Sequence, residues 1–177
     1  MLKTLILYST VDGQTLEICK RISKTLRETG DVEIFNISEA SKVQISKYDG
    51  FILGASIRYG KHRSDVFNFI KKNQKTINSK KNAFFSVNVV ARKPEKNTPD
   101  TNPYMQKFLE LSLWRPELLA VFGGKIDYPK YGLIDKFMIR LIMWITNGPI
   151  DTSGTFEFTD WDKVDDFSQE FNQRLDR

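Results

Sequence analysis

Short apolar runs alternate with segments of helical periodicity along this chain, and this alternation restricts the possible folds more than any other feature. The five runs cover residues 5–8, 32–37, 50–55, 83–90 and 118–122. Strands that are apolar along nearly their whole length are typical of a parallel sheet whose two faces are both covered by helices. The sequence therefore predicts an α/β fold with a five-stranded parallel sheet in the doubly wound order 2-1-3-4-5.

About thirty residues between the fifth predicted strand and residue 155 exceed what this minimal fold needs. Within them, residues 133–146 hold ten large apolar side chains among fourteen. As a helix this segment would be about 21 Å long, too short to span a hydrocarbon core of about 30 Å. It is a candidate for a core helix, a subunit-contact helix or a helix that lies in a membrane interface. We predict one domain over residues 1–177, with an insertion at about residues 124–153.

Charge and composition narrow the classes of partner and of site. The chain has 27 Lys and Arg against 22 Asp and Glu, a net charge of +5, which favours nucleic acid, anionic lipid or an acidic small molecule as partner. A single cysteine, Cys19, and a single histidine, His62, exclude an internal disulfide and a metal site built from several thiolates or imidazoles. No run has the roughly 18 to 20 apolar residues of a membrane-spanning helix, and the first run is too short for a signal-peptide core. We therefore expect a cytoplasmic location.

The first apolar run ends in a loop that is rich in hydroxyl groups and leads into a helix. This loop lacks the lysine of a Walker A motif and the second and third glycines of a dinucleotide fingerprint. Backbone N–H groups at a helix N-terminus can hold a phosphate monoester without a cationic side chain, although Thr10 or Asp12 could instead serve only to cap the helix. The candidate binding residues of this loop are Ser9, Thr10, Asp12, Gly13, Gln14 and Thr15.

The loops after the third and fourth strands should meet the first loop at the carboxyl edge of the sheet. Gly54 and Ala55 would let a flat ring approach the backbone, and Tyr59 could stack on that ring or cover the edge of the core. Further candidates beside a ligand are Ser56, Ile57, Arg58, Ser86, Val87, Asn88, Val89 and Ala91.

Basic residues also gather in these two loops. They could receive substrate carboxylates, or they could form an ordinary solvated face. The candidates for substrate contact are Arg58, Lys61, Arg63, Arg92 and Lys93. His62 lies among them, but an isolated loop histidine is more typical of the surface than of a proton-transfer site.

The first loop resembles the flavodoxin phosphate loop, Ser/Thr-x-Thr-Gly-x-Thr, in Thr10, Gly13 and Thr15, with Asp12 where a hydroxyl is usual. Other runs resemble those of the flavodoxin-like, menaquinone-dependent protoporphyrinogen IX dehydrogenases of bacterial haem synthesis. These runs are residues 54–60, 91–96, 114–116, 137–139 with 141–143, and 159–161. The resemblance covers almost the whole chain.

This resemblance implies a flavodoxin-like fold with a long-chain type insertion, and bound FMN held by the candidate residues of the three loops. It implies oxidation of protoporphyrinogen IX to protoporphyrin IX, with menaquinone or another quinone as acceptor. A membrane quinone also favours contact of the insertion with an anionic membrane surface. We therefore expect a peripheral location on the cytoplasmic face of the cell membrane. We expect no nucleic-acid partner. A homo-oligomer stays open.

Three other functions stay open on the residues alone. They are a flavodoxin-type electron carrier, a general quinone reductase with a nicotinamide donor, and a non-enzymatic anion-binding module. Electron-carrier flavodoxins are typically acidic, whereas this chain carries a net charge of +5. No acid–base pair is visible in the sequence, so no catalytic residue is assigned.

Overall fold

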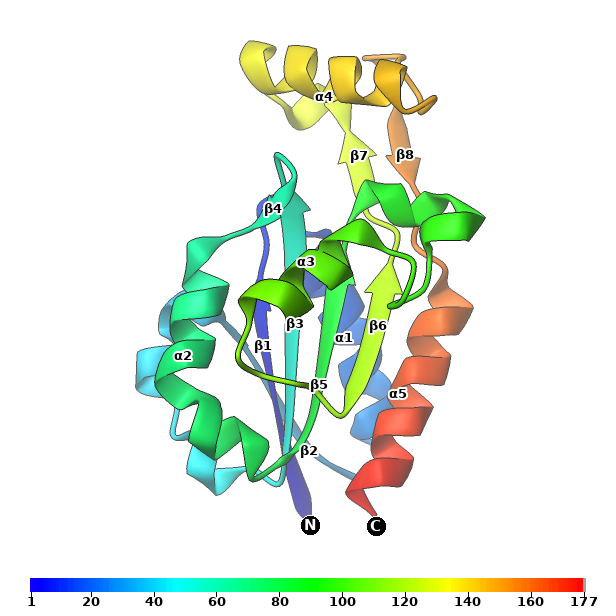
Figure 1. Ribbon diagram of the computed structural model, residues 1–177. Coiled ribbons are helices and arrows are strands. Elements are labelled where there is room, and N and C mark those ends of the chain that lie inside the picture. The colour runs from blue at the N-terminus through cyan, green and yellow to red at the C-terminus, as the bar shows by residue number, and fades with distance from the viewer. Residues whose placement is uncertain (177) are drawn as a thin grey trace.

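The computed structural model describes residues 1–176, and its centre is a sheet of five parallel strands in the order β2-β1-β3-β5-β6 (Figure 1). This order confirms the predicted doubly wound topology. A short strand, β4 (Lys61–His62), pairs antiparallel with the end of β3. The parallel strands are β1 (Leu2–Ser9), β2 (Gly30–Asn36), β3 (Gly50–Arg58), β5 (Lys81–Val87) and β6 (Leu118–Phe122).

Helices cover both faces of this sheet, as the apolar strands required. Successive residues of a strand point to opposite faces, so Leu5 and Leu7 of β1 pack in one buried cluster and Ile6 in another. The Leu5 face is covered by α2 (Ser64–Asn78) and α3 (Pro103–Leu111), and the Ile6 face by α1 (Gln14–Leu26) and α5 (Trp161–Leu175). Both faces of the sheet are therefore shielded from water, which explains why polar and apolar residues do not alternate along the strands.

The fourth parallel strand is shorter than the sequence predicted. It ends at Val87, and residues 89–92 form the 3₁₀ turn η3 (Val89–Arg92) instead of continuing the strand. The cause is Asn88, whose side-chain Oδ1 accepts a hydrogen bond from the backbone N–H of Ala91 at 3.1 Å. This cap turns the chain across the carboxyl edge of the sheet, next to the loops after β1 and β3.

The insertion forms a separate ribbon and a helix beyond the same edge (Figure 1). Its strands β7 (Lys125–Asp127) and β8 (Thr155–Glu157) pair only with each other, antiparallel, and lead out to α4 (Leu133–Ile145). The sequence predicted a strand near residue 155 but not this partner. At the base of the ribbon the outgoing and returning chains are in close contact at Gly123 and Phe158. A Cβ at Gly123 would overlap the carbonyl oxygen of Phe158, so this approach requires a glycine. Within residues 1–176, no helix is long and apolar enough to cross a membrane.

Gly54, in the middle of β3, has a different role from the predicted one. The ring of Phe85 on β5 lies over Gly54, and any Cβ at Gly54 would overlap that ring. The small residue therefore makes room for a core phenylalanine and not for a bound ring.

Candidate functional site

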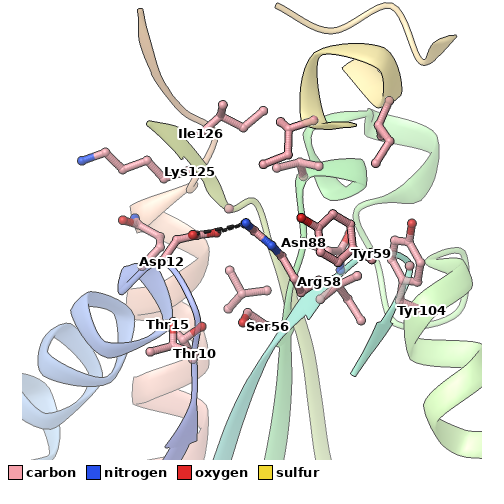
Figure 2. Close-up of a pocket in the computed structure, with 18 of the residues that line it drawn as sticks. Thr10, Asp12, Thr15, Ser56, Arg58, Tyr59, Asn88, Tyr104, Lys125 and Ile126 are labelled. Atoms are coloured by element: carbon pink, nitrogen blue, oxygen red, sulfur yellow. Dashed lines mark hydrogen bonds and ion pairs between the residues drawn. The ribbon is translucent and has the colours of Figure 1, made fainter. Parts of the chain in front are cut away.

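The loops at the carboxyl ends of β1, β3 and β5 surround a pocket, and the insertion supplies the remaining wall (Figure 2). The pocket holds about 760 Å³ of empty space, open solvent at its mouth included. It brings together eleven of the predicted cofactor-binding residues: Thr10, Asp12, Gln14, Thr15, Ser56, Ile57, Arg58, Tyr59, Val87, Asn88 and Val89. Four others do not line it: Ser9, Gly13, Ser86 and Ala91.

The start of α1 forms the polar end of the pocket. Gly13 precedes the helix with a φ of 91°, in the left-handed region, and no side chain among residues 1–176 caps the helix. The hydroxyl of Thr10 instead accepts a hydrogen bond from the Gly13 N–H at 3.1 Å. The alternative that Thr10 or Asp12 merely caps the helix is therefore wrong. The N–H groups of Leu16 and Glu17 donate to the carbonyl oxygen of Gly13, while those of Gln14 and Thr15 have no acceptor within residues 1–176 and are left to another group.

The side chain of Thr15 indicates what kind of acceptor fits there. Its side chain is completely buried at the pocket, and its Oγ1 has no hydrogen-bond partner within residues 1–176. A buried hydroxyl without a partner costs roughly 1 to 3 kcal/mol, so such groups are rare in native proteins. The uncapped helix and this hydroxyl together fit an anionic, hydrogen-bond-accepting group such as a phosphate.

Arg58 joins the polar end of the pocket to the insertion. Its guanidinium lies 2.9 Å from a carboxylate oxygen of Asp12 and 2.9 Å from one of Asp135 on α4, and Figure 2 shows it reaching across the pocket toward Asp12. It also stacks between the rings of Tyr59 and Tyr131, at 5.0 and 5.3 Å from their centroids. Asp12 thus does not cap the helix, and Arg58 offsets its negative charge at the polar end of the pocket.

The ion pairs around Arg58 affect its acidic partners differently. Burial raises the pKa of the Asp12 carboxyl above its ordinary value, and Arg58 opposes this rise. The hydroxyl of Tyr59 donates a hydrogen bond to Asp135 and, together with Arg58, lowers the pKa of that carboxyl. Arg58 is itself held in the charged form by the two carboxylates.

Tyr59 occupies a tight hairpin turn between β3 and β4. Tyr59 and Gly60 have φ values of 49° and 78°, both positive, as the two central residues of a type I′ turn require. The turn places the Tyr59 ring at the mouth of the pocket, with 48% of the residue exposed. This position is compatible with the predicted stacking role.

The same turn carries His62 into the core, so the expectation of a surface histidine was wrong. The residue pairs with Ile57 across the hairpin, and its ring contacts the rings of Phe84 and Phe108 at centroid distances of 5.6 and 5.7 Å. Its Nε2 lies 3.0 Å from Oγ of Ser86, to which Asn88 of the pocket also donates a hydrogen bond. Burial lowers the pKa of His62 to about 4, so the ring is neutral at pH 7.

The sequence missed one whole wall of the pocket. This wall is formed by α3 and the insertion, which the predicted site did not include. Its residues are Tyr104, Gly124, Lys125, Ile126, Tyr131, Ile139, Ile142 and Met143. A usable signal existed in the spacing of Ile139, Ile142 and Met143, which puts one apolar side of the helix toward a neighbour. That neighbour could not be identified without the fold.

The predicted substrate cations other than Arg58, which lines the pocket, lie in three different places. Lys61 and Arg63 lie at the β3–β4 hairpin and Lys93 lies directly after η3, and none of these three residues lines the pocket. The guanidinium of Arg92 donates to the carbonyl oxygens of Val89 and Thr146, at 2.9 and 2.8 Å. It therefore ties the end of α4 to η3, which argues against the predicted substrate contact by Arg92.

Comparison with known proteins was consistent with this geometry. The model of the Flavodoxin domain family matches residues 5–153. The protoporphyrinogen IX dehydrogenase (quinone) of Escherichia coli strain K12 is 45% identical over 177 residues, 99% of this chain and 98% of that protein. The enzyme of the same name from Leishmania major is 39% identical over 171 residues, 96% of this chain and 74% of that protein.

Solved structures share the fold at low sequence identity. Oxidised Flavodoxin 1 from Bacillus cereus has a TM-score of 0.52 and 19% identity, with 97% of each chain covered. A Fusobacterium nucleatum flavodoxin bound to flavin mononucleotide has a TM-score of 0.52 and 14% identity, with 99% of this chain and 98% of that chain covered.

The depressed pKa of His62 predicts how stability depends on pH. Its value of about 4 in the folded chain lies below the ordinary 6.5, so the unfolded chain binds more protons between these values. The stabilisation that the folded chain gains by keeping His62 neutral is fully present above about pH 6.5. About 2 to 3 kcal/mol of the free energy of unfolding should be lost as the pH falls to 4.5. Urea unfolding at pH 7 and 4.5 should show this loss for the native chain but not for His62→Gln. An identical pH dependence in both proteins would contradict the assignment.

Proposed function

Because the chain belongs to the protoporphyrinogen IX dehydrogenase (quinone) family of flavodoxin-like proteins, we propose that it binds FMN and uses it to oxidise protoporphyrinogen IX to protoporphyrin IX. Electrons leave to a membrane quinone, for which menaquinone is our candidate. The observation that carries the proposal is the buried, unpartnered hydroxyl of Thr15, found within residues 1–176 at the uncapped start of α1.

In this proposal the start of α1 holds the FMN phosphate. Thr15 would donate its hydroxyl, and the backbone N–H groups at the start of the helix would supply further donors. Asp12 is compatible with a nearby anion because Arg58 pairs with it at 2.9 Å. When bound, FMN supplies the electron-accepting chemistry that no side chain of this pocket provides.

The rest of the pocket suits the flat ring of the cofactor. Aromatic side chains from three segments face it, namely Tyr59, Tyr104 and Tyr131, and apolar ones from the insertion complete the wall. These groups would bind the ring by stacking and would exclude water from it. We therefore treat residues 1–177 as one FMN-binding domain with its insertion at about residues 124–153.

The insertion helix would place this pocket next to the membrane. One side of α4 lines the pocket through Ile139, Ile142 and Met143. The other side presents large apolar residues to solvent: Leu133, Ile134, Phe137, Met138, Leu141, Trp144 and Ile145. Lys130 and Arg140 are also exposed on the insertion. An apolar helix face with basic residues around it fits the interface of an anionic membrane, here the cytoplasmic face of the cell membrane.

The decisive experiment is an anaerobic titration of the FMN-loaded protein with protoporphyrinogen IX. The visible absorbance of the flavin should decrease as substrate is added and should recover on addition of a quinone. Absorbance that is unchanged by protoporphyrinogen IX but bleached by NADPH would instead support a nicotinamide-dependent quinone reductase.

The phosphate assignment predicts the effect of changing Thr15. Loss of one hydrogen bond to a charged group costs roughly 1.5 to 3 kcal/mol, so Thr15→Ala should raise the Kd for FMN about tenfold or more. Thr15→Ser keeps the hydroxyl and should bind FMN nearly as tightly as the native chain. Titration of each apoprotein by flavin fluorescence measures both values. Equal Kd values for the alanine variant and the native chain would refute the phosphate contact.

The membrane assignment predicts the effect of charge on the outer side of α4. Phe137 and Trp144 are 67% and 66% exposed, so replacing both with Asp should leave the fold and the FMN content intact. Since each apolar side chain withdrawn from lipid costs about 1.5 to 3 kcal/mol, binding to phosphatidylglycerol vesicles should fall at least about a hundredfold. Activity with a soluble quinone should survive.

The matched control for this variant is Leu113→Asp. Leu113 is equally exposed but lies after α3, away from the insertion, so this variant should bind vesicles like the native chain. Vesicle binding that is the same in all three proteins would mean that α4 does not contact the membrane.

A further inference from the structure

A second hollow adjoins the proposed FMN pocket at the β3–β4 hairpin. It holds about 1090 Å³ of empty space, open solvent included, and lies between the hairpin, the start of α2 and α3. We call it the hairpin groove. Five residues line both hollows: Ile57, Arg58, Tyr59, Gly60 and Tyr104. A ligand in the hairpin groove would therefore border directly on the FMN pocket.

The floor of the hairpin groove is apolar. It includes Ile57, Phe67 and Phe108, and at its edges Val11 and Leu111 are 47% and 59% exposed. His62 also lines it, and its ring is neutral at pH 7 because burial lowers the pKa to about 4. An apolar floor of this kind favours a ligand with a broad apolar body.

The rim of the hairpin groove is basic. Lys61, Arg63 and Lys107 line it, and all three are exposed. Arg63 and Lys107 form ion pairs of 3.4 and 3.3 Å with Asp65 and Glu110, which are weak because the partners are solvated. Lys61 makes no ion pair with any residue of the part of the chain that the structure describes. The rim can therefore receive carboxylates.

We propose that the hairpin groove is the substrate subsite, with the macrocycle of protoporphyrinogen IX on the apolar floor and its two propionates at Lys61 and Lys107. This inference rests on the proposed function and deepens it. It adds Lys107, Phe67 and Leu111 to the substrate residues and moves the site away from Arg92 and Lys93. Arg92 is already engaged with the carbonyl groups of η3 and α4, and Lys93 lies outside the groove.

The test measures binding of protoporphyrin IX, the stable oxidised product that carries the same two propionates, to the FMN-loaded chain by fluorescence titration. Replacing both Lys61 and Lys107 with Ala should raise the Kd for protoporphyrin IX about tenfold or more. The dimethyl ester of the probe lacks the two charges, so it should bind the native chain and the double variant equally. FMN content and the flavin spectrum should be unchanged in the double variant.

Three single variants locate the site. Leu111→Asp, at an exposed apolar position on the edge of the groove, should weaken binding of both the acid and the ester. Lys72→Ala, an exposed lysine outside both hollows, is the matched control and should bind the probe like the native chain. Lys93→Ala tests the competing location and should also bind like the native chain.

The outcomes separate the subsite from the function. If Lys93→Ala weakens binding, or if the Lys61 and Lys107 double variant binds protoporphyrin IX like the native chain, the hairpin groove is not the subsite. The proposed function survives either result as long as protoporphyrinogen IX bleaches the flavin of the native chain. If it does not bleach the flavin, the function itself fails, and the subsite falls with it.

Discussion

The position of Arg58 between two carboxylates holds the site together. Its guanidinium binds Asp12 in the loop after β1 and Asp135 on α4, both at 2.9 Å, with only 15% of its side chain exposed. Removing charges from water is costly, so such a bridge contributes less to net stability than to a unique arrangement of its partners. Here the bridge joins three segments distant in sequence, namely the loop after β1, the end of β3 and α4, and the arrangement closes the insertion over the pocket.

The closed insertion gives α4 two apolar sides with different surroundings. Ile142 and Met143 face the pocket, while Phe137 and Trp144 face solvent. Only the width of this helix therefore separates the pocket from the exposed apolar surface of α4. The short ribbon of β7 and β8 keeps this helix outside the main sheet, so the sheet and its core do not depend on the helix.

Much of the fold and part of the site could be predicted from local pattern. The parallel sheet covered on both faces follows from the alternation of apolar strands and helices, because such a sheet needs apolar residues throughout its strands. Once strands are parallel, their carboxyl ends share one edge, so the loops carrying Thr10, Ser56 and Asn88 had to meet. Residues of these loops that the sequence predicted therefore line much of the observed pocket.

The sequence by itself thus determined the layered sheet and the edge at which a ligand would bind, since both depend on properties of consecutive residues. Only the tertiary structure decided what distant residues do to each other. The pairing of Arg58 with Asp12 and Asp135, the burial of His62 behind a two-residue turn and the engagement of Arg92 by Thr146 all depend on contacts between separate segments. The physical reason is that charge, exposure and hydrogen bonding of a side chain are set by its neighbours in space, which local periodicity does not encode.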